Sequence, residues 1–338
     1  MHLVQLAHPY QGRRVAVVDG ERLRFLNGFQ STYQLAYAAI GRRVQIDELA
    51  TEDLSFSSES IEYTPVYEGR SEWKLRVPFD HPADPGHCLV SGTGLTHKAS
   101  AASRAKMHQQ EPTSITDSQR MYQWGLEGGS PPAGSAGVQP EWFYKGDGSI
   151  LCAHGEPLTV PAFADDGGEE PEIAGAYLIG PDGMPYRAGF MAGNEFSDHV
   201  MERKNYLYLA PSKLRECAIG PELVTHSGLQ NGFQNVDGIV AVERDGDVLW
   251  SAIIYTGEKN MSHSIANLEY HHFKYDAHRR PGEVHIHFYG ADAFSFGAGV
   301  KLEEDDAMVV SWSGFGRPLR NTLRVEQKIA KQIEIKTL

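Results

Sequence analysis

Short apolar segments, separated by glycine, proline and acid–glycine turns, run through most of this chain. Asp19-Gly20, Asp182-Gly183 and Asp245-Gly246 each stand between two such segments and are typical hairpin turns. The predicted strands lie at 14–18, 74–78, 89–92, 141–145, 172–179, 205–209, 237–244, 247–255, 283–289, 307–312 and 322–325. Helical patterns are fewer and cover 34–39, 98–110 and 117–126, the last with Asp117 as the expected N-cap. The pattern therefore predicts a strand-rich α+β protein.

A proline-rich polar stretch divides the chain into two unequal parts. Residues 1–87 alternate short strands and helices and are expected to form a small N-terminal α+β domain. The stretch at 81–86, His-Pro-Ala-Asp-Pro-Gly, is the candidate linker. Residues 88–338 are then long enough to form a larger domain with a core of its own.

Composition and charge exclude several classes of protein. The 338 residues are 41% hydrophobic and carry a net charge of −13 without any Lys/Arg-rich run, so nucleic acid is not an expected partner. No apolar run reaches the roughly 18 residues of a membrane span, and the N-terminus has no signal-peptide pattern. Cys88, Cys152 and Cys217 are too few and too far apart for a disulfide framework. We expect a cytoplasmic protein with reduced thiols.

The acidic residues around the apolar segment 172–179 are the strongest chemical signal. Glu170 and Glu172 alternate along an expected strand and so point to one face, where two desolvated carboxylates would repel. The Asp182-Gly183 turn brings the chain back toward Asn194-Glu195, which places Glu195 near the pair. Three oxygen ligands suit Mg²⁺, with Mn²⁺ or Ca²⁺ as alternatives. The other interpretation is a solvated acidic turn over 165–172.

Three basic side chains are candidates for catalysis. Lys145 and Lys213 each follow an expected apolar strand, where a lysine can balance carboxylates or transfer a proton. His97 follows the strand at 89–92 and opens a helix, a suitable place for proton transfer. Each of the three, taken singly, is more often a surface lysine or a structural histidine. The histidines at 271–272, 285 and 287 have no matching carboxylate and are expected to be core or interface residues.

These pieces occur in an order that resembles the catalytic domain of the fumarylacetoacetate hydrolase superfamily. That family has a histidine after a short strand, a Phe-x-Lys strand, a Glu-x-Glu pair and an acidic third ligand after asparagine. A lysine shortly before Gly-Pro follows, and then a Pro-Gly-Glu-Val strand leading to a glycine turn. This chain has them, in the same order, at His97, 143–145, 170–172, 194–195, Lys213 with 220–221, and 281–284 with 289–291.

The resemblance implies a mixed β-roll catalytic domain over 88–338, a divalent metal held by Glu170, Glu172 and Glu195, and a homodimer. Two departures matter. Hydrolases of the family often carry a glutamate three residues after the histidine, where this chain has Ser100, and the third ligand is usually aspartate. The segments 124–129 and 193–199 resemble the sugar-acid branch, which includes 2-keto-3-deoxy-pentonate dehydratases.

The resulting hypothesis is an Mg²⁺-dependent lyase. It would dehydrate a 2-keto-3-deoxy-pentonate, such as the arabinonate or xylonate, to 2-ketoglutarate semialdehyde, in non-phosphorylative sugar catabolism. Lys213 would assist the enolate or transfer the proton, His97 would protonate the leaving hydroxyl, and Lys145 would offset negative charge. A hydrolase that cleaves a C–C bond in a 2,4-diketo acid and a non-catalytic sugar-acid binding protein remain alternatives.

Overall fold

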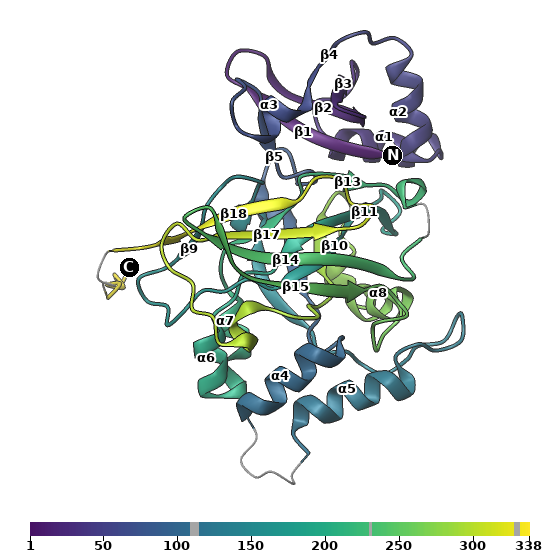
Figure 1. Ribbon diagram of the computed structural model, residues 1–338. Helices are drawn as coiled ribbons and strands as arrows, with labels where there is room; N and C mark the ends of the chain where they lie inside the picture. The colour runs from purple at the N-terminus through teal and green to yellow at the C-terminus, as the bar shows by residue number, and fades with distance from the viewer. Residues whose placement is uncertain (109–114, 230–231, 328–331) are drawn as a thin grey trace.

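The computed structural model describes residues 1–108, 115–229, 232–327 and 332–338. Its N-terminal part alternates strands and helices as the sequence predicts, and it forms the upper part of the molecule in Figure 1. Its elements are β1 (His2–His8), β2 (Gly12–Asp19), β3 (Arg22–Phe25), α1 (Thr32–Arg42), α2 (Ile46–Leu54), β4 (Ser60–Glu62), α3 (Tyr63–Tyr67) and β5 (Lys74–Arg76).

The remaining chain is richer in strands. Its helices are α4 (Lys98–His108), α5 (Asp117–Gly128), α6 (His199–Lys204), α7 (Leu209–Lys213) and α8 (Ile265–Phe273). Its strands are β6 (Cys88–Gly92), β7 (Phe143–Asp147), β8 (Leu151–Cys152), β9 (Leu158–Val160), β10 (Pro171–Ile179), β11 (Pro185–Asn194), β12 (Cys217–Ile219), β13 (Leu223–Val224), β14 (Val236–Arg244), β15 (Asp247–Thr256), β16 (Val284–Phe288), β17 (Ala307–Trp312) and β18 (Leu319–Val325).

In the described residues the strands make two sheets. The larger has the order β4-β3-β2-β1-β13-β11-β10-β16-β6-β7, and the smaller has the order β15-β14-β17-β18-β9. Most neighbours are antiparallel, but β16 with β6, β12 with β8 and β18 with β9 are parallel. The mixed α+β class is therefore confirmed. The boundary after residue 87 stays a prediction, because β1 pairs with β13 and joins both parts in one sheet.

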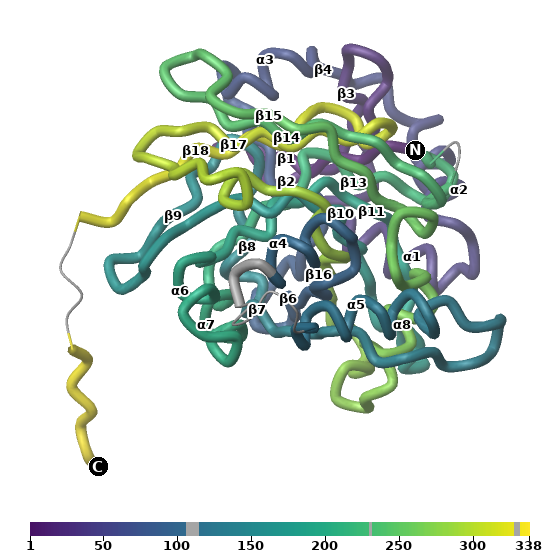
Figure 2. Tube along the Cα trace, turned by 60° about the horizontal axis from the view of Figure 1, so that its bottom comes forward, coloured from purple at the N-terminus to yellow at the C-terminus, as the bar shows by residue number. Residues whose placement is uncertain are grey.

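Strand β10 lies at the centre of the larger sheet, and every one of its residues is buried. Ala174, Ala176 and Leu178 pack with α1 and α2, whereas Ile173 packs toward the smaller sheet. A strand buried on both faces reads as a continuous apolar run, which explains why the sequence predicted it well. In Figure 1 the strands β14, β15, β17 and β18 lie in front of β10 and β11. Seen from below in Figure 2, α4, α6 and α7 surround β6, β7 and β8.

Two local predictions were wrong. Residues 205–209 do not form a strand, because Asn205 caps a short 3₁₀ turn (Tyr206–Tyr208) that runs into α7. Helix α5 is capped by Thr116, not Asp117: the Thr116 side chain accepts the Gln119 backbone N–H, and the Gln119 side chain accepts the Thr116 N–H.

The histidines of α8 and β16 are core residues, as predicted. His272 Nε2 lies 3.0 Å from His285 Nδ1, and the Trp142 indole donates to His272 Nδ1 at 3.1 Å. His287 contacts the hydroxyls of Ser91 and Thr93 at 2.8 and 2.7 Å. Burial, with the neighbouring histidines adding to it, lowers the pKa of both His285 and His287 to about 3. These rings are therefore neutral in the folded protein.

We expect these histidines to destabilise the protein as the pH falls below about 6.5. The unfolded chain then takes up protons that the folded protein does not bind, so stability present above pH 6.5 is lost toward pH 3. Each such histidine removes up to about 1.4 kcal/mol per pH unit. Urea unfolding at pH 7.5, 6.5 and 5.5 measures this loss. His285→Gln should make the slope shallower, and the exposed control His226→Gln should not. Equal unfolding free energies across this range would contradict the assignment.

Candidate metal centre

Three glutamates converge at one end of the β10–β11 hairpin. Glu170 precedes β10, Glu172 lies in it, and Glu195 follows β11. The antiparallel register pairs Glu172 with Gly193, and the Glu195 N–H donates to the Glu170 carbonyl at 2.9 Å. One carboxylate oxygen from each of the three lies within 4.8 Å of the others, and all three side chains are buried. The structure thus brings together the three residues that the sequence selected.

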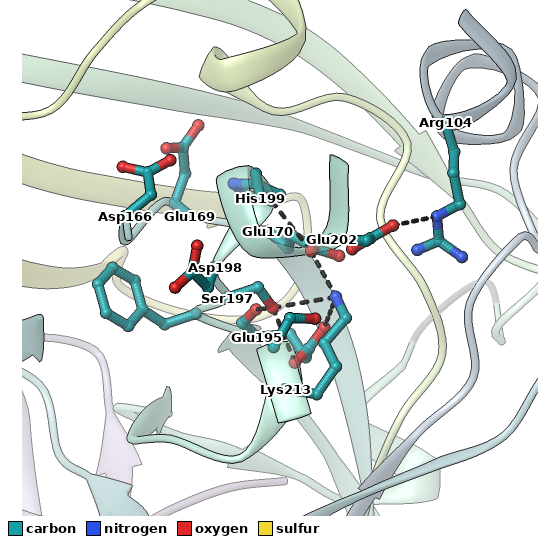
Figure 3. Close-up of polar contacts among 12 residues, drawn as sticks. Arg104, Asp166, Glu169, Glu170, Glu195, Ser197, Asp198, His199, Glu202 and Lys213 are labelled. Carbon is teal, nitrogen blue, oxygen red and sulfur yellow. Dashed lines mark hydrogen bonds and ion pairs between the residues drawn. The ribbon is translucent and has the colours of Figure 1, made fainter. Parts of the chain in front are cut away.

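Both predicted lysines reach this cluster. Lys213 Nζ donates to Glu170 Oε1 at 2.5 Å, to Glu195 Oε2 at 2.8 Å and to Ser197 Oγ at 2.9 Å (Figure 3). Lys145 Nζ donates to the Glu195 carboxylate and to the Phe196 carbonyl, the latter at 3.0 Å. Lys213 comes from the last residue of α7 and not from a strand end, whereas Lys145 lies in β7. Neither is a surface lysine, because both are about 1% exposed.

Burial and charge act against each other in these carboxylates. Burial raises the pKa of Glu170, but Lys213 and His199 outweigh it and hold that pKa well below its usual range. Burial, with Glu195 and Glu170 nearby, raises the pKa of Glu172 well above its usual range. Burial lowers the pKa of Lys213, but Glu170 and Glu195 outweigh it and raise that pKa, so Lys213 is an ammonium. Of the three glutamates, Glu172 is the one whose charge the lysines neutralise least.

The donor set fits a hard divalent cation. Glu170, Glu172 and Glu195 are buried together with the ammonium groups of Lys145 and Lys213. All three candidate ligands offer carboxylate oxygen, the donor that hard divalent cations prefer. Gly290 adds to the fit, because its positive φ of 98° turns its N–H onto Glu172 Oε2 at 2.6 Å. One oxygen of Glu172 is fixed in this way.

His97 is not brought to the carboxylates. Its ring is buried between two hydroxyls, with Nδ1 at 2.9 Å from Thr96 Oγ1 and Nε2 at 3.0 Å from Thr256 Oγ1. Burial lowers its pKa to about 3, so it carries no proton to donate as an imidazolium near neutral pH. Ser100 Oγ donates to the His97 carbonyl at 3.1 Å. Among the described residues, no carboxylate contacts the His97 ring.

Another histidine lies where the sequence analysis had assigned no role. His199 begins α6, its Nε2 lies 3.1 Å from Glu170 Oε1, and its ring stacks between Phe294 and Phe296. Its Nδ1 is buried without a hydrogen-bond partner among the described residues. Burial lowers the pKa of His199, but its hydrogen bond to Glu170 outweighs this and raises it. The run 193–199 had pointed to this segment, but not to which side chain faces the cluster.

The sequence analysis also did not predict an ion-pair network beside this cluster. Arg104 from α4 pairs with Glu141 at 2.6 Å and with Glu202 of α6 at 2.5 Å, and Tyr206 donates to Glu141 at 2.8 Å. In Figure 3 Glu202 lies between Glu170 and Arg104. A narrow cavity beside Glu170 and Glu172 is lined on its other side by Ser100, Arg104, His199 and Glu202. Glu170 and Glu172 therefore border a polar cavity that residues of α4 and α6 also line.

Comparisons with known proteins show what this chain is similar to. No family model matches the chain. A curated protein described as a probable 2-keto-3-deoxyxylonate dehydratase of Haloferax volcanii is 29% identical over 122 residues, which is 36% of this chain and 40% of that protein. The match thus spans well under half of that relative.

Two solved structures show the same fold over almost the whole chain. A 2-keto-3-deoxy-D-arabinonate dehydratase complexed with magnesium and 2,5-dioxopentanoate has a TM-score of 0.71 at 18% identity, covering 97% of this chain and 100% of that one. A 2-hydroxyhepta-2,4-diene-1,7-dioate isomerase from Mycobacterium marinum has a TM-score of 0.58 at 15% identity, with the same coverage. The chain shares the fold of these solved enzymes, and over about a third of its length it is similar to a probable pentonate dehydratase. The resemblance seen in the sequence is thereby confirmed.

We expect Glu172→Gln to abolish measurable binding of Mg²⁺ in titration calorimetry, because it removes one charged ligand from three. The matched control is Glu169→Gln, a buried neighbour whose two oxygens accept the Ser295 N–H and hydroxyl instead of facing the cluster. The control should bind Mg²⁺ as the natural protein does. Equal affinity in the Glu172 variant would show that the metal is held elsewhere.

Proposed function

We propose that this protein is a divalent-metal-dependent dehydratase of 2-keto-3-deoxy sugar acids, with Mg²⁺ as the metal. The observation that carries the proposal is the set of three buried glutamates with a buried ammonium group between two of them. The local match to a probable 2-keto-3-deoxyxylonate dehydratase supports the substrate class. The magnesium complex of the structural neighbour supports the metal, since its fold matches almost the whole chain. No helix among the described residues is long and apolar enough to cross a bilayer.

The reaction would remove water from C3 and C4 of the substrate. A divalent ion held by Glu170, Glu172 and Glu195 would polarise the 2-keto group and so acidify the C3–H bond. Loss of the C3 proton and of the C4 hydroxyl leaves a C3–C4 double bond. This double bond migrates toward the C5 hydroxyl, and the resulting enol becomes an aldehyde, which gives a 2-ketoglutarate semialdehyde. No oxidant or second substrate is needed.

Lys213 is the residue that we assign to the reacting atoms. Its ammonium is fixed by three hydrogen bonds next to two of the proposed ligands, so a negative charge that develops on the keto oxygen would lie close to it. Lys145 is bound to Glu195 and to a backbone carbonyl, and we assign it to holding that ligand and offsetting its charge. The two lysines therefore differ in role although both are buried.

We no longer assign proton delivery to the departing hydroxyl to His97. His97 does not line the cavity beside the glutamates, whereas His199 does. His199 has a raised pKa and an unpartnered Nδ1, so we propose that it, together with Lys213, supplies protons in place of His97. His97 then has a positioning role through Thr96 and Thr256.

The surroundings of His97 also favour elimination over hydrolysis. A hydrolase needs a base to activate water, and a neutral histidine becomes such a base when a carboxylate orients it. Here Ser100 occupies the position of that carboxylate in the family pattern, and the ring contacts are two hydroxyls. Elimination needs an acid for the leaving group instead. We therefore rank the C–C hydrolase of a 2,4-diketo acid second.

Lys213→Ala should lower kcat with a 2-keto-3-deoxy-pentonate by about 10²-fold or more, the usual size of a general acid–base contribution. Magnesium binding should persist, because the change removes a cation and leaves all three carboxylates. Steady-state kinetics and calorimetry on the same preparation measure both. Lys204→Ala is the matched control, since Lys204 is half exposed and pairs with Asp165 away from the cluster. Near-normal turnover in Lys213→Ala would remove Lys213 from the mechanism.

The choice of reaction is tested by substrate preference. With Mg²⁺ present, kcat/KM for dehydration of a 2-keto-3-deoxy-pentonate should exceed kcat/KM for cleavage of any 2,4-diketo acid, because no carboxylate among the described residues contacts His97 to make it a base for water. Semialdehyde and pyruvate are the two products to quantify. A preference for C–C cleavage would establish the hydrolase. Tight binding of both compounds without turnover would establish a binding protein.

A further inference from the structure

Glu202 is a carboxylate of the cavity wall that the proposed mechanism does not use. It comes from α6, is buried, and lines the same cavity as Glu170 and Glu172. Its Oε1 lies 2.5 Å from Arg104 Nε, whereas its Oε2 accepts no hydrogen bond from any described residue. Figure 3 shows Glu202 between Arg104 and Glu170. A buried carboxylate oxygen without a donor costs free energy, so a ligand group that donates to Oε2 would be stabilised there.

The other carboxylate that pairs with Arg104 has no such vacancy. Glu141 Oε2 accepts a hydrogen bond from Arg104 Nη1 at 2.6 Å, and Glu141 Oε1 accepts the Tyr206 hydroxyl at 2.8 Å. Both oxygens of Glu141 are therefore used. Of the two glutamates that pair with Arg104, Glu202 is the one that can accept a further hydrogen bond.

The buried ammonium group of the metal centre does not supply that bond. Lys213 Nζ has three hydrogens, and it donates to three acceptors, on Glu170, Glu195 and Ser197. A donor for Glu202 Oε2 therefore has to come from outside the described residues, either from water or from a bound ligand.

The cavity in front of Glu202 is small. Its volume of about 20 Å³ is little more than one water molecule needs. A 2-keto acid that binds beside Glu170 and Glu172 must widen it. The end of that ligand furthest from the metal then meets the opposite wall, where Ser100, Arg104 and Glu202 lie.

Charge determines which ligand ends fit this wall. The guanidinium group of Arg104 is already paired with two carboxylates, those of Glu141 and Glu202, so it offers little attraction to a third one. A carboxylate at the end of the ligand would also lie against Glu202 and be repelled. A hydroxyl in the same place can donate to Glu202 Oε2, and a hydrogen bond to an ionised acceptor is stronger than a neutral one.

We propose that Glu202 determines which tail a 2-keto acid can carry beyond C4. It accepts the hydroxyl on C5 of a sugar acid and excludes a carboxylate at the same place. This inference rests on the proposed function, because the metal is what places the 2-keto-acid end of the ligand. The isomerase that shares the fold is named for a 1,7-dioate, a compound with two carboxylates. The fold alone therefore does not choose between the two tails, and the residues of the wall do.

The first test compares three ligands of five carbons by titration calorimetry of the natural protein with Mg²⁺. They differ only at C5, which carries a hydroxyl in 5-hydroxy-2-oxopentanoate, hydrogen in 2-oxopentanoate and a carboxylate in 2-oxoglutarate. The hydroxylated ligand should bind about 10-fold more tightly than 2-oxopentanoate, the usual effect of one hydrogen bond to a charged group. 2-Oxoglutarate should bind the most weakly of the three.

The second test is Glu202→Gln, which removes one negative charge and offers an N–H group in place of Oε2. Binding of 5-hydroxy-2-oxopentanoate should weaken about 5-fold or more, because a neutral hydrogen bond replaces a charge-assisted one. Binding of 2-oxoglutarate should become tighter. Damage to the site would weaken both ligands, so the opposite shifts identify a role in specificity. Glu52→Gln is the matched control, since Glu52 is exposed on α2 and pairs with Arg42.

The outcomes separate this inference from the proposed function. If none of the three ligands binds in the presence of Mg²⁺, the proposed function fails and the role of Glu202 fails with it. If the three bind equally well, or if 2-oxoglutarate binds as tightly as the hydroxylated ligand, the proposed function stands and Glu202 does not select the tail. Equal shifts of both ligands in Glu202→Gln would overturn the inference in the same way.

Discussion

The attraction between two buried ammonium groups and a cluster of buried glutamates is the interaction on which this architecture depends. An unpaired charge in the interior costs several kcal/mol, and Lys213 and Lys145 reduce this cost for Glu170 and Glu195 by contacting them. Each partner comes from a different element: the hairpin β10–β11, the helix α7 and the strand β7. The site therefore exists only after these elements have packed, and their packing is in turn specified by the charges. Of the three glutamates, Glu172 has the least of its charge compensated by the lysines. A bound cation would therefore stabilise its carboxylate most.

Much of this could be predicted from local sequence. Residues 173–179 of β10 form an unbroken apolar run, and Asp182-Gly183 marks the hairpin turn that follows it, so the approach of Glu195 to Glu170 and Glu172 follows from strand geometry. The element that carries Lys213 could not be read in the same way. Residues 205–209 are apolar and short, and such a run fits a strand or a buried helical turn equally well by periodicity. Asn205 as a cap was the signal for a helical turn.

Contacts between elements that are distant in the chain could not be predicted from the sequence. Arg104 meets Glu141 and Glu202 because α4 and α6 pack together, and no spacing along the chain encodes that. The contact between His199 and Glu170 depends equally on where α6 starts. His97 shows the opposite case: the motif selected it, but its ring contacts Thr96 and Thr256 and does not line the cavity beside the glutamates. Sequence motifs selected segments that come together in the fold, and tertiary packing decided which side chains of those segments face the cavity.

The pairing of β1 with β13 has a consequence for how the chain acquires its fold. His2 and Leu3 pair with Val224 and Leu223, so this contact joins residues some 220 positions apart in the chain. The β1–β2 hairpin and the pairing of β5 with Gln5, Leu6 and Ala7 join closer segments, so only the start of β1 depends on so distant a partner. Long-range pairing of this kind slows folding and leaves an apolar strand available to wrong partners in the meantime. The separation of these residues along the chain, and not only their final contact, therefore determines when the large sheet can close.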